Sequence, residues 1–216
     1  MLFRSVRVGT AVQDLELRYA LPTGLSLWSD TTVPDYTAVD GTGGEVGLKF
    51  QSAIAGQIVG LRFHKGPGNS GTHSGRLWSA AGSLLSSVTF SNETASGWQQ
   101  QDLSAPLSID SNTTYVVSCR IPNGHPSITE DYFLVGGYTN GPLRALPNSA
   151  GGNGVFLYGS FGFPTNSDQG ANFWVDIVFV PATNSPSLIA TDQSVLTIED
   201  SSTNLVLSGI GGGGGL

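Results

Sequence analysis

The sequence predicts an all-β fold, an antiparallel β-sandwich of the jelly-roll kind with additional strand-forming segments at its N- and C-terminal ends. Three features indicate this. Apolar and polar residues alternate with a period of two in most runs, whereas helical spacing is nearly absent. The 30 glycines and 11 prolines gather mainly in the stretches between these runs. Only 12% of the residues are charged, so the Lys, Glu and Arg that usually cover helix surfaces are scarce.

Four runs place their apolar residues on one face, as strands covered on one side do. These residues are Val46, Leu48 and Phe50; Val59, Leu61 and Phe63; Leu84, Val88 and Phe90; and Tyr115, Val117, Cys119 and Ile121. A fifth run, residues 172–180, is apolar on both faces apart from Asp176, which is typical of a central strand covered on both sides. Turn-rich stretches separate the runs at 66–75, 122–126, 136–154 and 159–170. Short strands at this spacing predict a sandwich.

The two ends differ from the middle and suggest three parts. Residues 1–26 form an N-terminal arm with the strand-like pieces "RSVRV" and "LELRYAL", and residues 27–181 form the sandwich. Residues 182–216 form a C-terminal arm with "QSVLTI" and "TNLVLSGI", followed by a glycine tail. Because two strands do not fold alone, we expect this arm to pack on the sandwich, on the N-terminal segment or on another copy of the chain.

Composition and charge exclude several classes of partner. The net charge of -7 argues against nucleic acid, whose binding depends on Lys and Arg contacts to phosphate. No stretch approaches the roughly 20 apolar residues of a membrane span. The first residues have no continuous apolar region, so we expect no secretory signal peptide and take Met1 as the start. Cys119 is the only cysteine, and its apolar position predicts a buried, inert thiol rather than a reactive one.

The loop "GPGNSGTHSGRLW", residues 66–78, raises the question of a binding site. Its glycines suit turns with positive φ or close backbone approach. His73 in this loop and His125 in "PNGH" suggest two imidazoles at one end of the sandwich, with Asn123 beside them. The main expectation is that both rings hydrogen-bond to backbone, and the alternative is a polar contribution to a ligand site. Zinc needs three or four ligands, and no suitable histidine spacing supplies them.

Aromatic side chains are the other candidate ligand residues, because sugars stack on exposed rings. Trp28, Trp78 and Trp174 are expected to pack in the core or at its edge. Trp98 opens a strand after a turn, where a half-exposed ring is common. Tyr132, Tyr138 and Tyr158 lie on or beside glycine-rich loops and are equally eligible, and Tyr158 is taken as the candidate. The candidate ligand-binding residues are therefore His73, Trp98, Asn123, His125 and Tyr158.

No arrangement of residues predicts catalysis. Asp30, Asp35, Asp40 and Glu45 cluster in the first loop, and a solvated acidic loop is preferred there over a structural Ca²⁺ site. The sequence has no nucleophile elbow, phosphate-binding loop or dinucleotide fingerprint. We therefore expect a protein that is not an enzyme and has no cofactor.

The phrases "KGPGNSGTH" with "GRLW", "NETASGWQQ", "PNGH" and "GVFLYGSFGFPTNSDQGANFWVDIVF" together carry a family resemblance. Over about residues 27–180 the chain resembles the bacterial family called domain of unknown function 4082. One departure is His64, where members usually have an aromatic residue. The resemblance implies a β-sandwich module of the kind found beside carbohydrate-active or surface-attached domains in secreted proteins. It implies no catalytic residue.

Two functions follow as expectations. The first is a structural virion protein, a bacteriophage capsid decoration or tail-associated protein made in the host cytoplasm, whose sandwich contacts host-surface glycans. Its arms would hold it to other virion proteins or to sister subunits in a homo-oligomer such as a trimer, because such proteins lend strands to open sheet edges. The alternative is a carbohydrate-binding module of an extracellular or cell-surface bacterial protein, which should be monomeric and self-contained.

Overall fold

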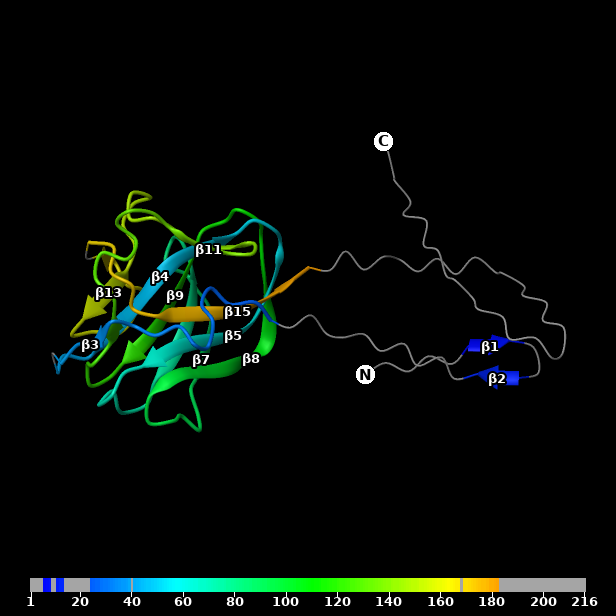
Figure 1. Ribbon diagram of the computed structural model, residues 1–216, viewed down its shortest axis with the longest axis horizontal. Coiled ribbons are helices and arrows are strands. Elements are labelled where there is room, and N and C mark those ends of the chain that lie inside the picture. The colour runs from blue at the N-terminus through cyan, green and yellow to red at the C-terminus, as the bar shows by residue number, and fades with distance from the viewer. Residues whose placement is uncertain (1–5, 9–10, 14–23, 40, 168, 183–216) are drawn as a thin grey trace. The chain divides into compact units, whose positions relative to one another are not determined.

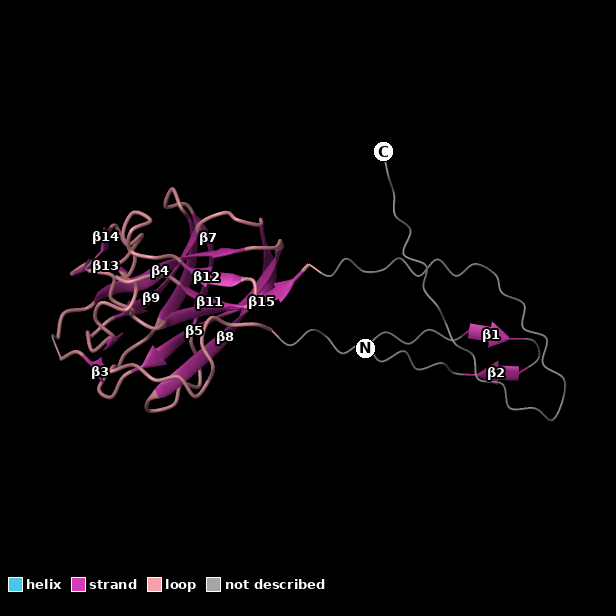
Figure 2. Cartoon of the chain, turned by 45° about the horizontal axis from the view of Figure 1, so that its top comes forward, coloured by secondary structure: helices cyan, strands magenta, loops and turns pink. Residues whose placement is uncertain are grey.

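The computed structural model describes residues 6–8, 11–13, 24–39, 41–167 and 169–182 (Figure 1). The chain divides into two units, Met1–Ala182 and Thr183–Leu216, and all described residues belong to the first. Every long regular element among the described residues is a strand (Figure 2). The described residues contain no helix with the length and apolar character needed to cross a membrane.

Part of the predicted N-terminal arm is described. Strands β1 (Val6–Val8) and β2 (Ala11–Gln13) form an antiparallel pair in which Val6 is opposite Gln13. Strand β1 falls within the predicted piece "RSVRV". The predicted piece "LELRYAL" and both predicted pieces of the C-terminal arm lie outside the described residues.

Two antiparallel sheets form the sandwich, which confirms the predicted fold class. The larger sheet has the order β11-β12-β4-β9-β6-β7, and β13 and β14 extend it beside β4. Its strands are β4 (Gly44–Ser52), β6 (Ser74–Ser79), β7 (Leu84–Thr89), β9 (Tyr115–Ile121), β11 (Tyr138–Asn140), β12 (Leu143–Ala145), β13 (Val155–Tyr158) and β14 (Asn166–Ser167). The smaller sheet has the order β15-β5-β8, from Val175–Pro181, Gly56–Lys65 and Gly97–Ile109. A separate short pair joins β3 (Tyr36–Thr37) to β10 (Ser127–Ile128).

The core lies between the two sheets and follows the predicted alternation. Leu48 and Val117 of the larger sheet and Leu61 and Ile177 of the smaller sheet are all fully buried in one cluster. Such strands bury alternate residues because successive side chains point to opposite faces. Cys119 is also buried in this core, as predicted.

Two predicted core positions are wrong, and irregular strand pairing explains both. Ile58 is fully buried whereas Val59 is only partly buried, because the pairing of β5 with β8 shifts between Ile58 and Gly60. Leu84 is 52% exposed instead of buried, since the pairing of β6 with β7 shifts beside it. An extra residue in one strand interrupts the two-residue alternation, so side chains beyond it change faces.

The chain enters and leaves the described sandwich at the same end of the two sheets (Figure 1). Leu25 exchanges two backbone hydrogen bonds with Phe179, each 2.7 Å long, and the Ala182 N–H donates to the Ala55 carbonyl at 3.0 Å. The opposite end of β5 is Lys65, which pairs with Gly97 and bridges to Pro126. The loops that contain the predicted histidines therefore lie at the end away from these two attachment points.

Candidate functional site

A row of three polar side chains crosses the outer face of the smaller sheet. Asp176 of β15 is paired with Arg62 of β5, and Arg62 is paired with Gln100 of β8. Residues opposite each other in paired strands share a face of the sheet. Asp176 is fully buried, Arg62 is 5% exposed and Gln100 is exposed, so the row runs from the interior to solvent.

The buried end of this row holds the segment 24–30, here called the strap. The Asp176 carboxylate accepts hydrogen bonds from the backbone N–H groups of Leu27 at 2.9 Å and Trp28 at 3.2 Å. It also accepts the N–H of Ile177 at 2.7 Å. Burial raises the pKa of Asp176 to about 6, although these hydrogen bonds and Arg62 oppose the shift. The carboxylate therefore connects the strap to the sheet.

The Arg62 guanidinium is enclosed by groups from the strap and the sheet. Its Nη2 donates to Asp30 Oδ1 at 2.7 Å, and its Nη1 lies 3.4 Å from the Trp28 carbonyl oxygen and 3.9 Å from Asp176 Oδ2. Its central carbon lies 4.6 Å from the centre of the Trp98 ring. Two carboxylates thus face one guanidinium and more than neutralise its charge.

A cavity of about 490 Å³ lies over this row. The strap, apart from Leu27, forms one wall, and Arg62, Gln100, Asn140 and Val178 form the rest. We call this cavity the polar hollow. Asp30, Gln100 and Asn140 are exposed, with 87% of the Asp30 side chain accessible, so its rim presents polar groups to solvent. Its size falls in the range of small-molecule sites.

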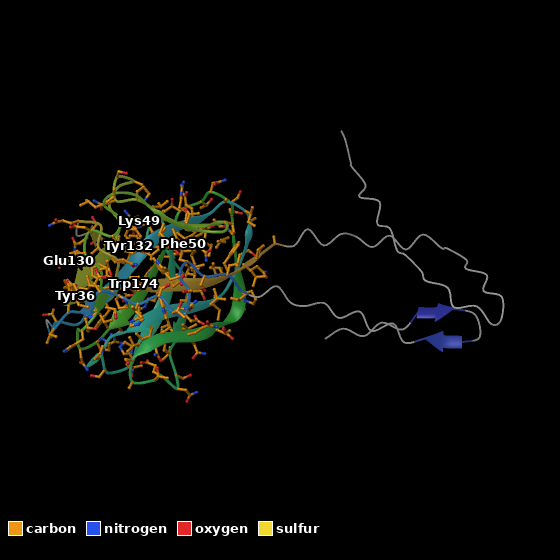
Figure 3. The ribbon with its side chains drawn as sticks, viewed as in Figure 1. Tyr36, Lys49, Phe50, Glu130, Tyr132 and Trp174 are labelled. Atoms are coloured by element: carbon orange, nitrogen blue, oxygen red, sulfur yellow. The ribbon has the colours of Figure 1, made fainter. Side chains whose placement is uncertain are left out.

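Aromatic rings support the hollow from below. Trp28 stacks on Trp98 and Tyr138 with centroid distances of 6.4 and 5.8 Å. Its indole N–H donates to the Tyr132 hydroxyl at 3.0 Å, and Tyr132 lies beside Trp174 with ring centroids 5.6 Å apart (Figure 3). Because Trp28 is 1% exposed, its ring contributes packing rather than a platform for stacking a ligand.

The family of this sandwich follows from a comparison of the sequence. The family model described as "Domain of unknown function (DUF4082)" matches residues 31–175. The chain belongs to this family. The resemblance in the loop and strand phrases is thereby confirmed. A comparison with curated proteins gives no match.

His73 is fully buried inside the DUF4082 domain. Its Nδ1 lies 2.8 Å from a carboxylate oxygen of Glu93, and its Nε2 lies 2.8 Å from the amide oxygen of Asn69. Burial lowers the pKa of His73, and Glu93 opposes this shift. The expected backbone partner is wrong for this ring, because both nitrogens face side chains and hold the ends of two loops together.

Asn123 and His125 lie against the same loop of the DUF4082 domain as His73. The Asn123 amide donates to the backbone carbonyl and the hydroxyl of Ser70, at 3.2 and 3.1 Å. His125 has a φ of 66°, and its Nδ1 lies 3.1 Å from the Asn123 carbonyl oxygen. The expected backbone partner is therefore confirmed for His125. The structure thus brings His73, Asn123 and His125 to the loop 66–71.

The two aromatic candidates belong to other groups of side chains. Trp98 is partly buried, packs in the ring cluster under the polar hollow and donates its indole N–H to the Thr32 carbonyl at 2.9 Å. Tyr158 belongs to β13 in the larger sheet, where it is 37% exposed and lies 4.9 Å from the Phe156 ring. The expected packing of Trp28, Trp78 and Trp174 is confirmed, because these rings are 1%, 7% and 2% exposed.

The predicted acidic loop does not exist as one group. Asp30 contacts Arg62 on the smaller sheet, whereas Glu45 is fully buried in β4 of the larger sheet and pairs with Arg76 and Ser118. The prediction of a solvated position is therefore wrong for Glu45, and burial raises its pKa. Asp40 lies outside the described residues. The part of the chain that the structure describes holds no group of three or more His, Cys, Asp or Glu suited to a metal.

The polar hollow itself was not predicted from the sequence. Its residues Asp30, Gln100 and Asn140 are ordinary polar residues of loops and strand edges. One signal did exist, because Asp176 is the lone charge in an otherwise apolar strand. A buried carboxylate needs hydrogen-bond or ion-pair partners. The partners of Asp176 are Arg62 and the strap, which both line the hollow.

Proposed function

We propose that this protein is a non-enzymatic structural protein of a virus particle, a bacteriophage capsid decoration or tail-associated protein that displays its DUF4082 sandwich outward. The observation that carries the proposal is the position of the two attachment points. Leu25 pairs with Phe179, and Ala182 bonds to Ala55, so the chain enters and leaves the sandwich at one end. A domain tethered at one end presents its other end and its side faces to a partner.

The flanking segments would supply the attachment. Residues 1–26 and 182–216 would hold the sandwich to other virion proteins or to sister copies, for example as a trimer. The antiparallel pair of β1 and β2 supports this proposal, because strands in an arm suit pairing with open sheet edges. The polar hollow would contact surface polysaccharide of the host.

Light scattering after size exclusion tests the assembly. The full chain is compared with a chain restricted to residues 24–182, whose folding is checked by tryptophan fluorescence and cooperative thermal unfolding. We expect a defined oligomer for the full chain and a monomer for the restricted one. A monomeric full chain at micromolar concentration would contradict the proposal.

A second candidate is a carbohydrate-binding module of a bacterial surface or secreted protein. The polar hollow favours it, because exposed amide and carboxylate groups around a cavity of this size suit sugar hydroxyls. This candidate predicts that the full chain and the restricted chain are both monomers and bind the same glycan equally well. The two measurements together therefore separate the two candidates.

A further inference from the structure

We infer that the polar hollow selects sugars that donate hydrogen bonds and carry no negative charge, namely neutral hexose or amino-sugar units. This inference rests on the proposed glycan contact and deepens it. It follows from which atoms around the hollow are already engaged, and from the charge around Arg62.

The rim of the hollow presents hydrogen-bond acceptors. The Asn140 amide nitrogen donates to the Ser26 carbonyl at 2.8 Å, and the Gln100 amide nitrogen lies 3.3 Å from Asp102 Oδ1. Each amide group thus engages one of its two N–H donors within the protein and keeps its oxygen for a ligand, so acceptors remain on the rim beside one further N–H of each amide. Asp30 uses Oδ1 for Arg62, and its second oxygen is a further acceptor on an exposed side chain. Sugar hydroxyls and ammonium groups are the matching donors.

The charge around the hollow disfavours an anion. Arg62 is the one cationic side chain among its lining residues. Asp30 bonds to it at 2.7 Å, and the buried Asp176 lies 3.9 Å from it. Asp102 adds a third carboxylate beside Gln100. Three carboxylates against one guanidinium leave a negative field, which repels a carboxylate or sulfate on a ligand.

The remaining wall is apolar and suits the C–H groups of a sugar ring. Leu25 is partly buried and Val178 is 8% exposed, and both line the hollow. Sugar sites commonly combine an apolar surface for the ring with a few placed polar groups for the hydroxyls. The hollow provides both without a ring platform.

Three pyranoses with the same ring separate the charge classes: glucose is neutral, glucosamine is cationic and glucuronate is anionic. Each is titrated into the ¹⁵N-labelled full chain while amide chemical shifts are followed. We expect shifts of the Gln100 and Asn140 side-chain amides with glucose and glucosamine, at millimolar concentrations, and none with glucuronate. Equal or stronger shifts with glucuronate, or no shift at these residues with any of the three, would overturn the inference.

Variants of the full chain identify the groups responsible. Asp30→Asn keeps the size of the side chain and removes its charge, so we expect glucosamine to bind about tenfold more weakly, as for loss of a charge-assisted hydrogen bond. Gln100→Ala should weaken both sugars by about threefold or more. Asp35→Asn, at an exposed carboxylate outside the hollow, is the matched control. Unchanged glucosamine binding in Asp30→Asn, with unchanged thermal unfolding, contradicts the inference.

A glycan array probed with the full chain distinguishes this inference from the proposed glycan contact. Binding confined to acidic glycans overturns the selectivity and leaves a glycan contact standing. If the array shows no binding and the titration shows no chemical-shift change, both the selectivity and the proposed glycan contact are overturned. Array binding to neutral or amino-sugar glycans that Asp30→Asn weakens supports both.

Discussion

The Asp176 carboxylate accepts the backbone N–H of Leu27 at 2.9 Å, although 149 positions separate the two residues in sequence. This hydrogen bond joins the beginning of the sandwich to its last strand. It also fixes the strap as one wall of the polar hollow, because Trp28 and Asp30 follow directly. The structural and the proposed binding roles of this region therefore depend on one buried carboxylate.

Removing this carboxylate should destabilise the fold. In Asp176→Ala the buried N–H groups of Leu27 and Trp28 lose their acceptor, and Arg62 keeps only Asp30 as an ion partner. We expect the free energy of unfolding at pH 7 to fall by about 2–4 kcal/mol, measured by denaturant titration. Asp102→Asn, at an exposed carboxylate on the same sheet, should change it by less than about 0.5 kcal/mol. A loss of similar size in both variants would contradict the special role of Asp176.

The pH dependence of stability should also report Asp176. Its pKa is raised to about 6 in the fold, against 3.8 for an ordinary aspartate. Between these values the folded carboxyl holds its proton while the unfolded one has lost it. The pH-dependent part of the stabilisation from this group is thus complete below pH 4 and is lost as the pH rises through 6, by about 3 kcal/mol. The loss expected for Asp176→Ala at pH 7 is the part that remains above this pH range.

This contribution is measured as the difference in unfolding free energy between the wild type and Asp176→Ala at each pH from 4 to 7. Subtracting the variant removes the slopes due to other groups. We expect the advantage of the wild type to shrink as the pH rises, and the carboxyl carbon of Asp176 to titrate near pH 6 by NMR. An advantage that grows with pH would show that the pKa is lowered instead.

The strands could be predicted from the sequence because period-two alternation is a local property. Leu48, Leu61 and Val117 are buried where the alternation places them. The errors at Val59 and Leu84 arise where strand pairing shifts by a residue. Such a shift depends on the partner strand, so no single run of sequence contains it.

The candidate site could be predicted only in part for a related reason. The pattern placed His73 and His125 near one another, and the structure brings both to one loop. The polar hollow, however, is made by the strap, β5, β8, β11 and β15, whose residues meet only after the sheets have formed. Asp176 illustrates the difference. The sequence shows that it is the lone charge in an apolar strand, but its partners Leu27, Trp28 and Arg62 are identified only by the structure.

A glycine in the larger sheet should resist substitution because of close backbone approach. A Cβ atom on Gly47 of β4 would collide with the Val117 carbonyl oxygen and lie 2.8 Å from the Ser118 Cα. We expect Gly47→Ala to lower the free energy of unfolding by about 1–3 kcal/mol, measured by denaturant titration. At Gly136 the same change meets no atom within 4 Å, so Gly136→Ala should be neutral or slightly stabilising. Equal losses in the two variants would contradict the packing explanation.

The buried pair of His73 and Glu93 should respond to removal of the Glu93 charge. Burial lowers the pKa of His73, while the hydrogen bond and the charge of Glu93 raise it. In Glu93→Gln the opposing effect is lost and Lys65, which also lowers this pKa, has no carboxylate beside it. We therefore expect the pKa of His73 to fall further, followed through its ring resonances by NMR.

The lowered pKa of His73 also predicts the direction in which stability changes with pH. Because burial lowers the pKa of His73 in the fold relative to the unfolded ring, stability should decrease as the pH falls below about 6.5. This loss of stability at low pH should be larger in Glu93→Gln. In His73→Gln, which has no titratable ring at this position, the part due to His73 should disappear. A rise in the pKa of His73 in Glu93→Gln would contradict the role of Glu93 as the group that raises this pKa.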